Sequence, residues 1–229
     1  MKNYLIKIYR YLKNGYIKKG INSNSVWYGS NYGGFYVYPS LLNEKSIVYS
    51  FGVGEDISFD KMINDKHDCS VYAFDPTPKS INWVKNQSLF EKFHFYEYGI
   101  SDKSSWVDFY LPKNQNFVSG SVVSSSHLNV NDKISVRMKT LKDIMIELNH
   151  SHIDLLKMDI EGSEYAVIED ILNSNILINQ LQIEFHARFF SDGVRKTKQS
   201  IQKLKEHGYE IFAISNTYEE ISFIRKAVL

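Results

Sequence analysis

Several features that define common protein classes are missing from this sequence. The single cysteine, Cys69, cannot form an internal disulfide, which excludes a disulfide-stapled secreted scaffold. Four prolines in 229 residues leave no proline-rich linker. The 27 basic and 26 acidic side chains nearly cancel, so binding of nucleic acid through net charge is disfavoured. No apolar run approaches the length of a membrane span.

The N-terminal segment is basic and amphipathic. Residues 1–20 carry six Lys or Arg side chains, and Lys7 and Arg10 interrupt the apolar run that a signal peptide needs. Apolar residues recur there at helical spacing, namely Leu5, Ile8, Tyr9, Leu12 and Tyr16. This pattern predicts a helix that docks on the domain or joins a homo-oligomer, with weak attachment to an anionic membrane surface as the alternative. We expect a cytoplasmic protein, where a lone cysteine stays reduced.

From residue 46 onward, strand-like and helix-like segments alternate. Strands are predicted at residues 46–51, 69–75, 93–100, 106–112, 134–140, 152–160, 181–190, 209–216 and 221–228, and helices at 56–65, 79–87, 141–148, 162–172 and 194–208. The alternation indicates an α/β fold with a doubly wound, mostly parallel sheet. We expect residues 1–45 to form an N-terminal extension and 46–229 the main domain. The polar, Ser-rich segment 111–133 is a candidate loop and lid.

The end of the first predicted strand carries a glycine-rich turn. In Phe51-Gly52-Val53-Gly54, the two glycines allow a tight turn and a close approach of backbone to ligand. The third glycine of a dinucleotide fingerprint is missing, and the acids Glu55 and Asp56 would repel a pyrophosphate. NAD and FAD are therefore disfavoured, and a cationic or zwitterionic nucleoside is favoured. An ordinary strand-to-helix turn is the alternative.

The next two strand ends supply further candidates for nucleoside binding. Asp75, followed by Pro76, lies about 20 residues after the glycines, where an acid accepts hydrogen bonds from ribose hydroxyls. The alternative for Asp75 is a helix cap. Ile100 and Ser101 follow the third strand and could flank an adenine, although a simple turn would look the same.

Five segments together resemble one known family. VYSFGVGEDISFD, VYAFDPTP, YEYGISDKSSWVDFY, MKTLKDIM and LLKMDIEGSEYAVI occur in the order seen in FkbM-type methyltransferases. These are class I enzymes that use S-adenosylmethionine, many of them associated with methylation of sugar or polyketide hydroxyls. The resemblance runs from about residue 28 to the C-terminus. It implies a seven-stranded Rossmann-like sheet whose last strand is antiparallel.

The resemblance also implies a donor site. Its residues would be Phe51, Gly52, Val53 and Gly54 under the methionine part, Asp75 and Pro76 at the ribose, Ile100 and Ser101 at the adenine, and Asp159 and Tyr32 beside them. Of the aromatic residues before the first strand, we expect Tyr28 or Tyr32 to reach the cleft, where a ring can attract a sulfonium. Ser50 and Asp56 depart from the usual class I pattern, which leaves open a non-catalytic donor-binding or scaffold protein of the same fold.

Two later strand ends carry the residues expected to perform the chemistry. Asp159 and Glu161 follow one strand, and Glu184 and His186 end the next. Methyl transfer requires alignment of the nucleophile and removal of its proton. We expect His186 to be the base, because an ordinary imidazole titrates near pH 6.5, with the three acids positioning the acceptor. A structural histidine is the alternative. Lys157 is expected on the opposite side of its strand from Asp159, without a role.

The same four residues could instead hold Mg²⁺ or Mn²⁺. This interpretation ranks lower, because motifs such as HExxH or paired CxxC are missing from the sequence. The preferred function is S-adenosylmethionine-dependent O-methylation of a small or glycan-linked acceptor, in surface-polysaccharide or natural-product biosynthesis. Nucleic acid is not an expected partner, and a nicotinamide oxidoreductase is the least favoured enzyme class.

Overall fold

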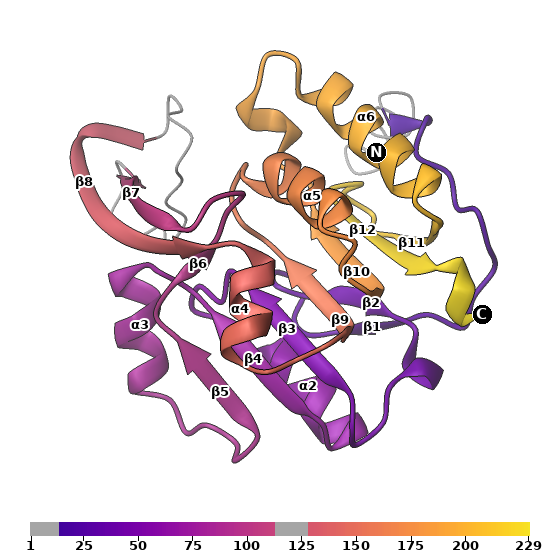
Figure 1. The fold of residues 1–229 in the computed structure, drawn as a ribbon, viewed down its shortest axis with the longest axis horizontal. Coiled ribbons are helices and arrows are strands. Elements are labelled where there is room, and N and C mark those ends of the chain that lie inside the picture. The colour runs from indigo at the N-terminus through magenta and orange to yellow at the C-terminus, as the bar shows by residue number, and fades with distance from the viewer. Residues whose placement is uncertain (1–13, 113–127) are drawn as a thin grey trace, which may run out of the picture.

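The computed structural model describes residues 14–112 and 128–229, and a seven-stranded sheet lies at its centre (Figure 1). In spatial order its strands are β11 (Tyr209–Ile214), β12 (Glu220–Arg225), β10 (Ile178–Glu184), β9 (Ile153–Met158), β3 (Ile47–Phe51), β4 (Ser70–Phe74) and β5 (Phe93–Tyr96). The five strands from β10 to β5 are parallel. Strand β12 is antiparallel to both of its neighbours. The predicted doubly wound sheet with an antiparallel last strand is confirmed.

The described residues contain five α-helices, which cover both faces of the sheet (Figure 1). They are α2 (Ser58–His67), α3 (Pro78–Lys85), α4 (Leu141–Glu147), α5 (Glu164–Asn173) and α6 (Gly193–Glu206). Along β3, Val48 packs with α2 and α3, whereas Tyr49 and Phe51 pack with α4, α5 and α6. Successive side chains of a strand point to opposite faces, so a strand covered on both sides is mostly apolar.

A short hairpin takes the place of a helix over part of one face. Its strands are β1 (Val26–Tyr28) and β2 (Phe35–Val37), and the 3₁₀ turn η1 (Pro39–Leu41) follows. The backbone oxygen of Tyr36 accepts a 2.9 Å hydrogen bond from the hydroxyl of Ser222 on β12. Tyr28 and Phe35 share a core with α2 and β4. The aromatic segment before the first strand is therefore packed against the main sheet.

A second, three-stranded sheet stands beside the main one. It consists of β6 (Gly99–Ile100), β7 (Ser105–Pro112) and β8 (Leu128–Lys139), in the order β6-β8-β7. The segment predicted as one strand at 93–100 is thus two strands, β5 and β6. The predicted loop 111–133 is also shorter than expected, because pairing of β7 with β8 extends to Pro112 and Leu128. A lid role for the rest of that loop lies outside the described residues.

Most of the predicted N-terminal helix also lies outside the described residues. Ile17, near its end, is buried in the main core, and the N–H of Gly20 donates to Ile211 of β11 at 2.8 Å. Contact of this segment with a membrane surface or with a second copy of the chain stays a prediction. In the described part of the chain, none of the helices has both the length and the apolar character needed to cross a bilayer.

Candidate active site

A cavity of about 300 Å³ opens at the carboxyl ends of β3, β4 and β9. Parallel strands end at a common edge, which is where ligands bind in folds of this kind. Nine of the residues predicted for the donor line it, namely Tyr32, Phe51, Gly52, Val53, Gly54, Asp75, Pro76, Ile100 and Asp159. Ser101 is not among the lining residues. Its hydroxyl donates a hydrogen bond to Asp102 at 3.1 Å. Tyr28 is buried and bonded to His67, so Tyr32 is the tyrosine that reaches the cavity.

The glycine turn joins three strand ends. Gly52 has φ +80° and Gly54 φ +57°, values that L side chains rarely adopt. A Cβ at Gly52 would overlap the backbone oxygen of Asp159, just after β9. The N–H of Gly52 donates to Phe74 of β4 at 3.0 Å. Position 52 therefore admits only glycine, and its bare backbone forms part of the cavity wall.

Asp75 fixes the glycine turn from the neighbouring strand. One carboxylate oxygen accepts the N–H of Gly54 at 2.9 Å, and the other accepts the N–H and hydroxyl of Thr77 at 2.9 and 2.6 Å. Burial raises the pKa of Asp75, and these hydrogen bonds oppose the rise. Asp75 is not the N-cap of α3, which is Thr77, but it holds the turn before that helix and borders the cavity.

Lys157 corrects one expectation. Its Nζ donates to the backbone oxygen of Gly52 at 2.8 Å and lies 5.6 Å from the centre of the Phe35 ring. The side chain is buried and borders the cavity together with Asp159. The expectation that Lys157 faces away from Asp159 was wrong, because residues i and i+2 of a strand share a face. Lys157 places a positive charge under the glycine turn.

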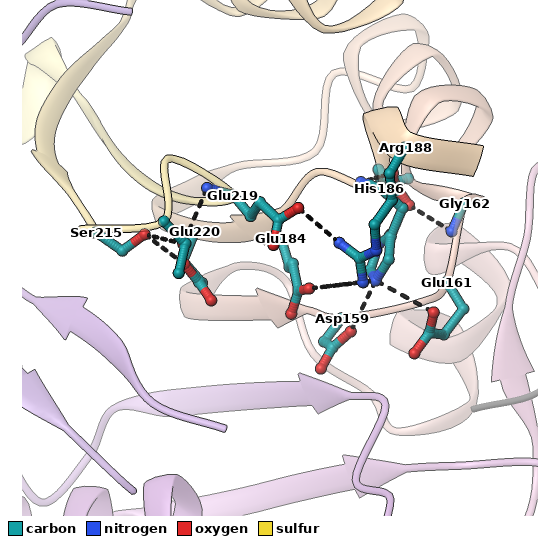
Figure 2. Close-up of polar contacts among 11 residues, drawn as sticks. Asp159, Glu161, Gly162, Glu184, His186, Arg188, Ser215, Glu219 and Glu220 are labelled. Atoms are coloured by element: carbon teal, nitrogen blue, oxygen red, sulfur yellow. Dashed lines mark hydrogen bonds and ion pairs between the residues drawn. The ribbon is translucent and has the colours of Figure 1, made fainter. Parts of the chain in front are cut away.

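The four residues predicted for chemistry lie together, around His186 (Figure 2). Asp159 and Glu161 follow β9, while Glu184 ends β10 and His186 comes two residues later. The Nε2 of His186 lies 3.5 Å from Asp159, 3.3 Å from Glu161 and 3.4 Å from Glu184. The imidazole is fully buried, yet neither ring nitrogen has a hydrogen-bond partner among the described residues. Asp159 and Glu161 also line the cavity, so the cluster borders it.

Glu164, a residue that the sequence analysis missed, holds His186 in place. Its carboxylate accepts the backbone N–H of His186 at 2.7 Å and that of Gly162 at 2.9 Å. One of its oxygens lies 3.5 Å from Nδ1 of the same imidazole. Glu164 is fully buried. In the sequence, Glu164 looks like any acid in the first turn of a helix, where the helix dipole alone explains its presence. No sequence signal pointed to its contact with His186.

The electrostatics of the cluster change the expected role of His186. Burial alone would lower the pKa of the imidazole, but the carboxylates of Glu164, Glu184 and Glu161 raise it to about 10. Burial, together with Asp159, raises the pKa of Glu184 to about 8. In the metal-free protein these carboxylates therefore favour the protonated form of His186. The expectation that it acts as the base rested on an ordinary imidazole pKa, and the raised pKa argues against that role.

The ion pair of Arg188 with Glu219 lies at the outer edge of the site. Arg188 lies 3.4 Å from Glu184 and 2.9 Å from Glu219, so it partly balances the carboxylates from the outside (Figure 2).

Three residues of the cluster could act as metal ligands. Asp159, Glu184 and His186 each offer a ligand atom, and these atoms lie within 4.8 Å of one another. They could hold a metal ion, as the sequence alternative foresaw.

Comparison with known proteins gives a consistent result. The human probable methyltransferase-like protein 24 is 25% identical over 205 residues, which cover 85% of this chain and 50% of that protein. The rat protein of the same name is 24% identical over 192 residues, covering 79% and 46% respectively. This chain thus spans about half the length of these relatives. A crystal structure of methyltransferase FkbM from Methylobacillus flagellatus matches 80% of this chain and 44% of its own, with 13% identity and a TM-score of 0.49. Residues 46–211 match the model of the methyltransferase FkbM domain, and the chain therefore belongs to that family.

Proposed function

We propose that this protein transfers a methyl group from S-adenosylmethionine to a hydroxyl oxygen of a small or glycan-linked acceptor, in the biosynthesis of a surface polysaccharide or natural product. One observation carries the proposal. Asp159 lines the cavity beside the glycine turn and also lies 3.5 Å from His186. A donor bound at the turn and an acceptor bound at the cluster would share one wall.

The residues around the cavity suit this donor. Gly52 and Gly54 present bare backbone, Asp75 offers a carboxylate to a ribose, and Ile100 offers an apolar wall to a base. Glu55 and Asp56 border the cavity as well and favour a ligand with a positive charge over a pyrophosphate. Lys157 would attract the carboxylate of the methionine part. When bound, S-adenosylmethionine supplies a methyl group already activated on a sulfonium.

The cluster beside the cavity suits the acceptor. In the reaction the sulfur–methyl bond breaks, a methyl–oxygen bond forms, and the hydroxyl proton must pass to a base. The carboxylates of Glu161 and Glu184 are the groups placed to take that proton. The pKa of Glu184, near 8, approaches the neutral range that a general base needs. In the metal-free protein, protonated His186 lies within 3.5 Å of these carboxylates and balances part of their charge. Five acids line the cavity and argue against a phosphate-rich acceptor such as nucleic acid, namely Glu55, Asp56, Asp75, Asp159 and Glu161.

Thermal unfolding with S-adenosylhomocysteine, S-adenosylmethionine and NAD tests the donor. A ligand at about 100 times its Kd adds about 2.7 kcal/mol. For a chain of this size that raises the Tm by about 5–10 °C. We expect this shift with the two sulfur nucleosides alone, its loss in Asp75→Asn, and its retention in Asp65→Asn, which replaces an exposed aspartate of α2 that does not line the cavity. A shift with NAD alone, or with none of the three, would contradict the donor assignment.

Turnover separates the enzyme from a non-catalytic protein of the same fold. S-adenosylhomocysteine release should be followed with a panel of sugar and polyol hydroxyl acceptors. Methylated product supports the enzyme, whereas donor binding without product across the panel would favour the scaffold alternative.

A further inference from the structure

We propose that Asp159, Glu184 and His186 form a binding site for one divalent cation of the Mg²⁺ or Mn²⁺ type. The cluster is more than a group of acids, because it contains a fully buried imidazole whose Nε2 points at them (Figure 2). Within the two ranges that the structure describes, that nitrogen has no hydrogen-bond partner. A buried polar atom without such a partner is uncommon in proteins and calls for a bound group.

The distances favour a shared ion over hydrogen bonds. Nε2 lies 3.5 Å from Asp159 and 3.4 Å from Glu184, beyond the 2.7–3.2 Å usual for an N–H···O bond. Ligand atoms placed about 2.1 Å from a common ion lie about 3.0 Å apart in octahedral geometry and about 3.4 Å apart in tetrahedral geometry. The two separations from Nε2 are close to this range, and all three ligand atoms lie within 4.8 Å of one another, so a small movement would bring them around one ion.

The back of the imidazole has the partner that metal-binding histidines usually have. Such histidines commonly direct their second ring nitrogen at a carboxylate, which fixes the ring. Here Glu164 lies behind the ring. Its carboxylate accepts the backbone N–H of His186 at 2.7 Å, and one of its oxygens lies 3.5 Å from Nδ1, an electrostatic contact and not a hydrogen bond. Glu164 itself is anchored by Gly162. The backbone of His186 is thus fixed, with a carboxylate behind the ring, before any ion arrives.

The balance of charge points the same way. Glu161, Glu164, Asp159 and Glu184 surround one imidazole, and Arg188 contacts only the outer side of Glu184, sharing itself with Glu219. A divalent cation would offset the excess negative charge. The two carboxylates suit Mn²⁺ or Mg²⁺, and the three residues include no thiolate or thioether, the ligands that favour a soft metal. Asp159 also borders the cavity, which gives the ion a route of entry.

The role of this ion rests on the proposed function. A hydroxyl beside a divalent cation loses its proton more easily. Glu161, which lies next to the three ligands, would then be the carboxylate nearest to that proton. The cation would select acceptors whose hydroxyl, alone or with a neighbouring oxygen, can reach it from the cavity.

The binding test needs neither donor nor acceptor. Mn²⁺ is titrated into EDTA-treated and dialysed protein, and free Mn²⁺ is counted by electron paramagnetic resonance. We expect one Mn²⁺ per chain, displaced by excess Mg²⁺. Asp159→Asn and Glu184→Gln should each weaken binding at least about tenfold, since losing even an outer partner of a metal ligand costs 10–100-fold.

Glu220→Gln is the matched control. Glu220 pairs directly with Glu184 across β10 and β12, but its carboxylate accepts hydrogen bonds from Ser215 and Thr217 (Figure 2). The Glu220→Gln substitution removes the same charge from the same region as Glu184→Gln does. It should change Mn²⁺ affinity less than about threefold. An equal loss in Glu220→Gln and Glu184→Gln would mean diffuse attraction and would overturn the site, as would the absence of stoichiometric Mn²⁺ in the unsubstituted protein.

A spectroscopic measurement guards against variants that fail to fold. In the unsubstituted protein, bound Mn²⁺ should show coupling to an imidazole nitrogen, and His186→Gln should remove it. Stoichiometric Mn²⁺ without that coupling would refute the assignment of His186. Stabilisation by S-adenosylhomocysteine, measured on the same samples, keeps the two proposals apart. Donor binding without Mn²⁺ binding rejects the cation alone, and the reverse result rejects the donor alone.

Discussion

The two sides of the cavity are built in opposite ways. On the proposed donor side, at the glycine turn, the buried carboxylate of Asp75 accepts three hydrogen bonds of 2.6–2.9 Å from Gly54 and Thr77. On the proposed acceptor side, the buried ring of His186 faces its carboxylates at 3.3–3.5 Å, too far for good hydrogen bonds. Both sides sit at the carboxyl edge of one sheet. One is satisfied internally, whereas the other has charges that a proton or an ion must balance.

The first side therefore depends on the shape of the backbone, and the second depends on the charge of its side chains. The donor side depends on backbone geometry, namely positive φ at Gly52 and Gly54 and N–H groups held by one acid. Such a site is complete before the ligand binds. The acceptor side depends on titratable side chains, so its state changes with pH and with what is bound. Substitutions on the two sides should therefore differ in size and even in sign.

The largest effect is expected from Gly52→Ala. Its Cβ would overlap the backbone oxygen of Asp159, and φ at this position is +80°. Left-handed strain costs about 1–2 kcal/mol and overpacking about 1–3 kcal/mol, so the free energy of unfolding should fall by about 2–5 kcal/mol. Urea unfolding measures this loss.

Gly208→Ala is the control, because φ there is +86° but nothing lies within 4 Å of the added Cβ. It should cost only about 1–2 kcal/mol. Equal losses would show that the contact with Asp159 is unimportant.

A comparison of Asp75→Asn with Glu184→Gln should reveal opposite signs. An amide in place of Asp75 puts an NH₂ group against the N–H of Gly54 or the donors of Thr77, which costs about 1–3 kcal/mol. Glu184 is different, because burial and Asp159 raise its pKa to about 8 from an ordinary value of 4.5. An acid with a raised pKa loses stability as pH rises through that range, and glutamine resembles its protonated form. In EDTA at pH 7.5, Glu184→Gln should therefore stabilise the protein by about 1–2 kcal/mol. Urea unfolding of both variants checks the signs, and a loss in both would contradict the comparison.

The fold and the location of the site could be predicted because both depend on local pattern. Apolar runs on strands such as β3 and β9 mark a sheet that is covered on both faces, and the residues that follow them mark its carboxyl edge. Asp159 and His186 were found in this way. Ser101 follows the two-residue strand β6 and is not among the residues that line the cavity, so its place at the adenine stays a prediction.

What could not be predicted depends on contacts between distant segments. The raised pKa of His186 requires carboxylates from two strand ends and a helix to meet at one ring. The role of Glu164 requires the backbone of residue 186 to lie beside α5. Lys157 is an intermediate case, because strand periodicity places it with Asp159, but only the fold puts Gly52 and Phe35 around it. Interactions between charges on distant segments cannot be predicted from the order of residues in the sequence.

The smallest effect, and the sharpest contrast with His186, concerns His150. Its Nδ1 lies 2.7 Å from the hydroxyl of Tyr49, and burial, together with His152 and His94, lowers its pKa from 6.5. The neutral ring is thus favoured in the folded protein. Its contribution is fully present above pH 6.5 and is lost as pH falls from 6.5 through the lower folded pKa. The free energy of unfolding should drop by less than about 1.4 kcal/mol per pH unit below pH 6.5, and less steeply in His150→Gln. Urea unfolding at pH 7.5, 6.5 and 5.5 measures both slopes. Identical slopes would mean that His150 titrates as it does in the unfolded chain, and that burial and the neighbouring histidines do not favour its neutral form.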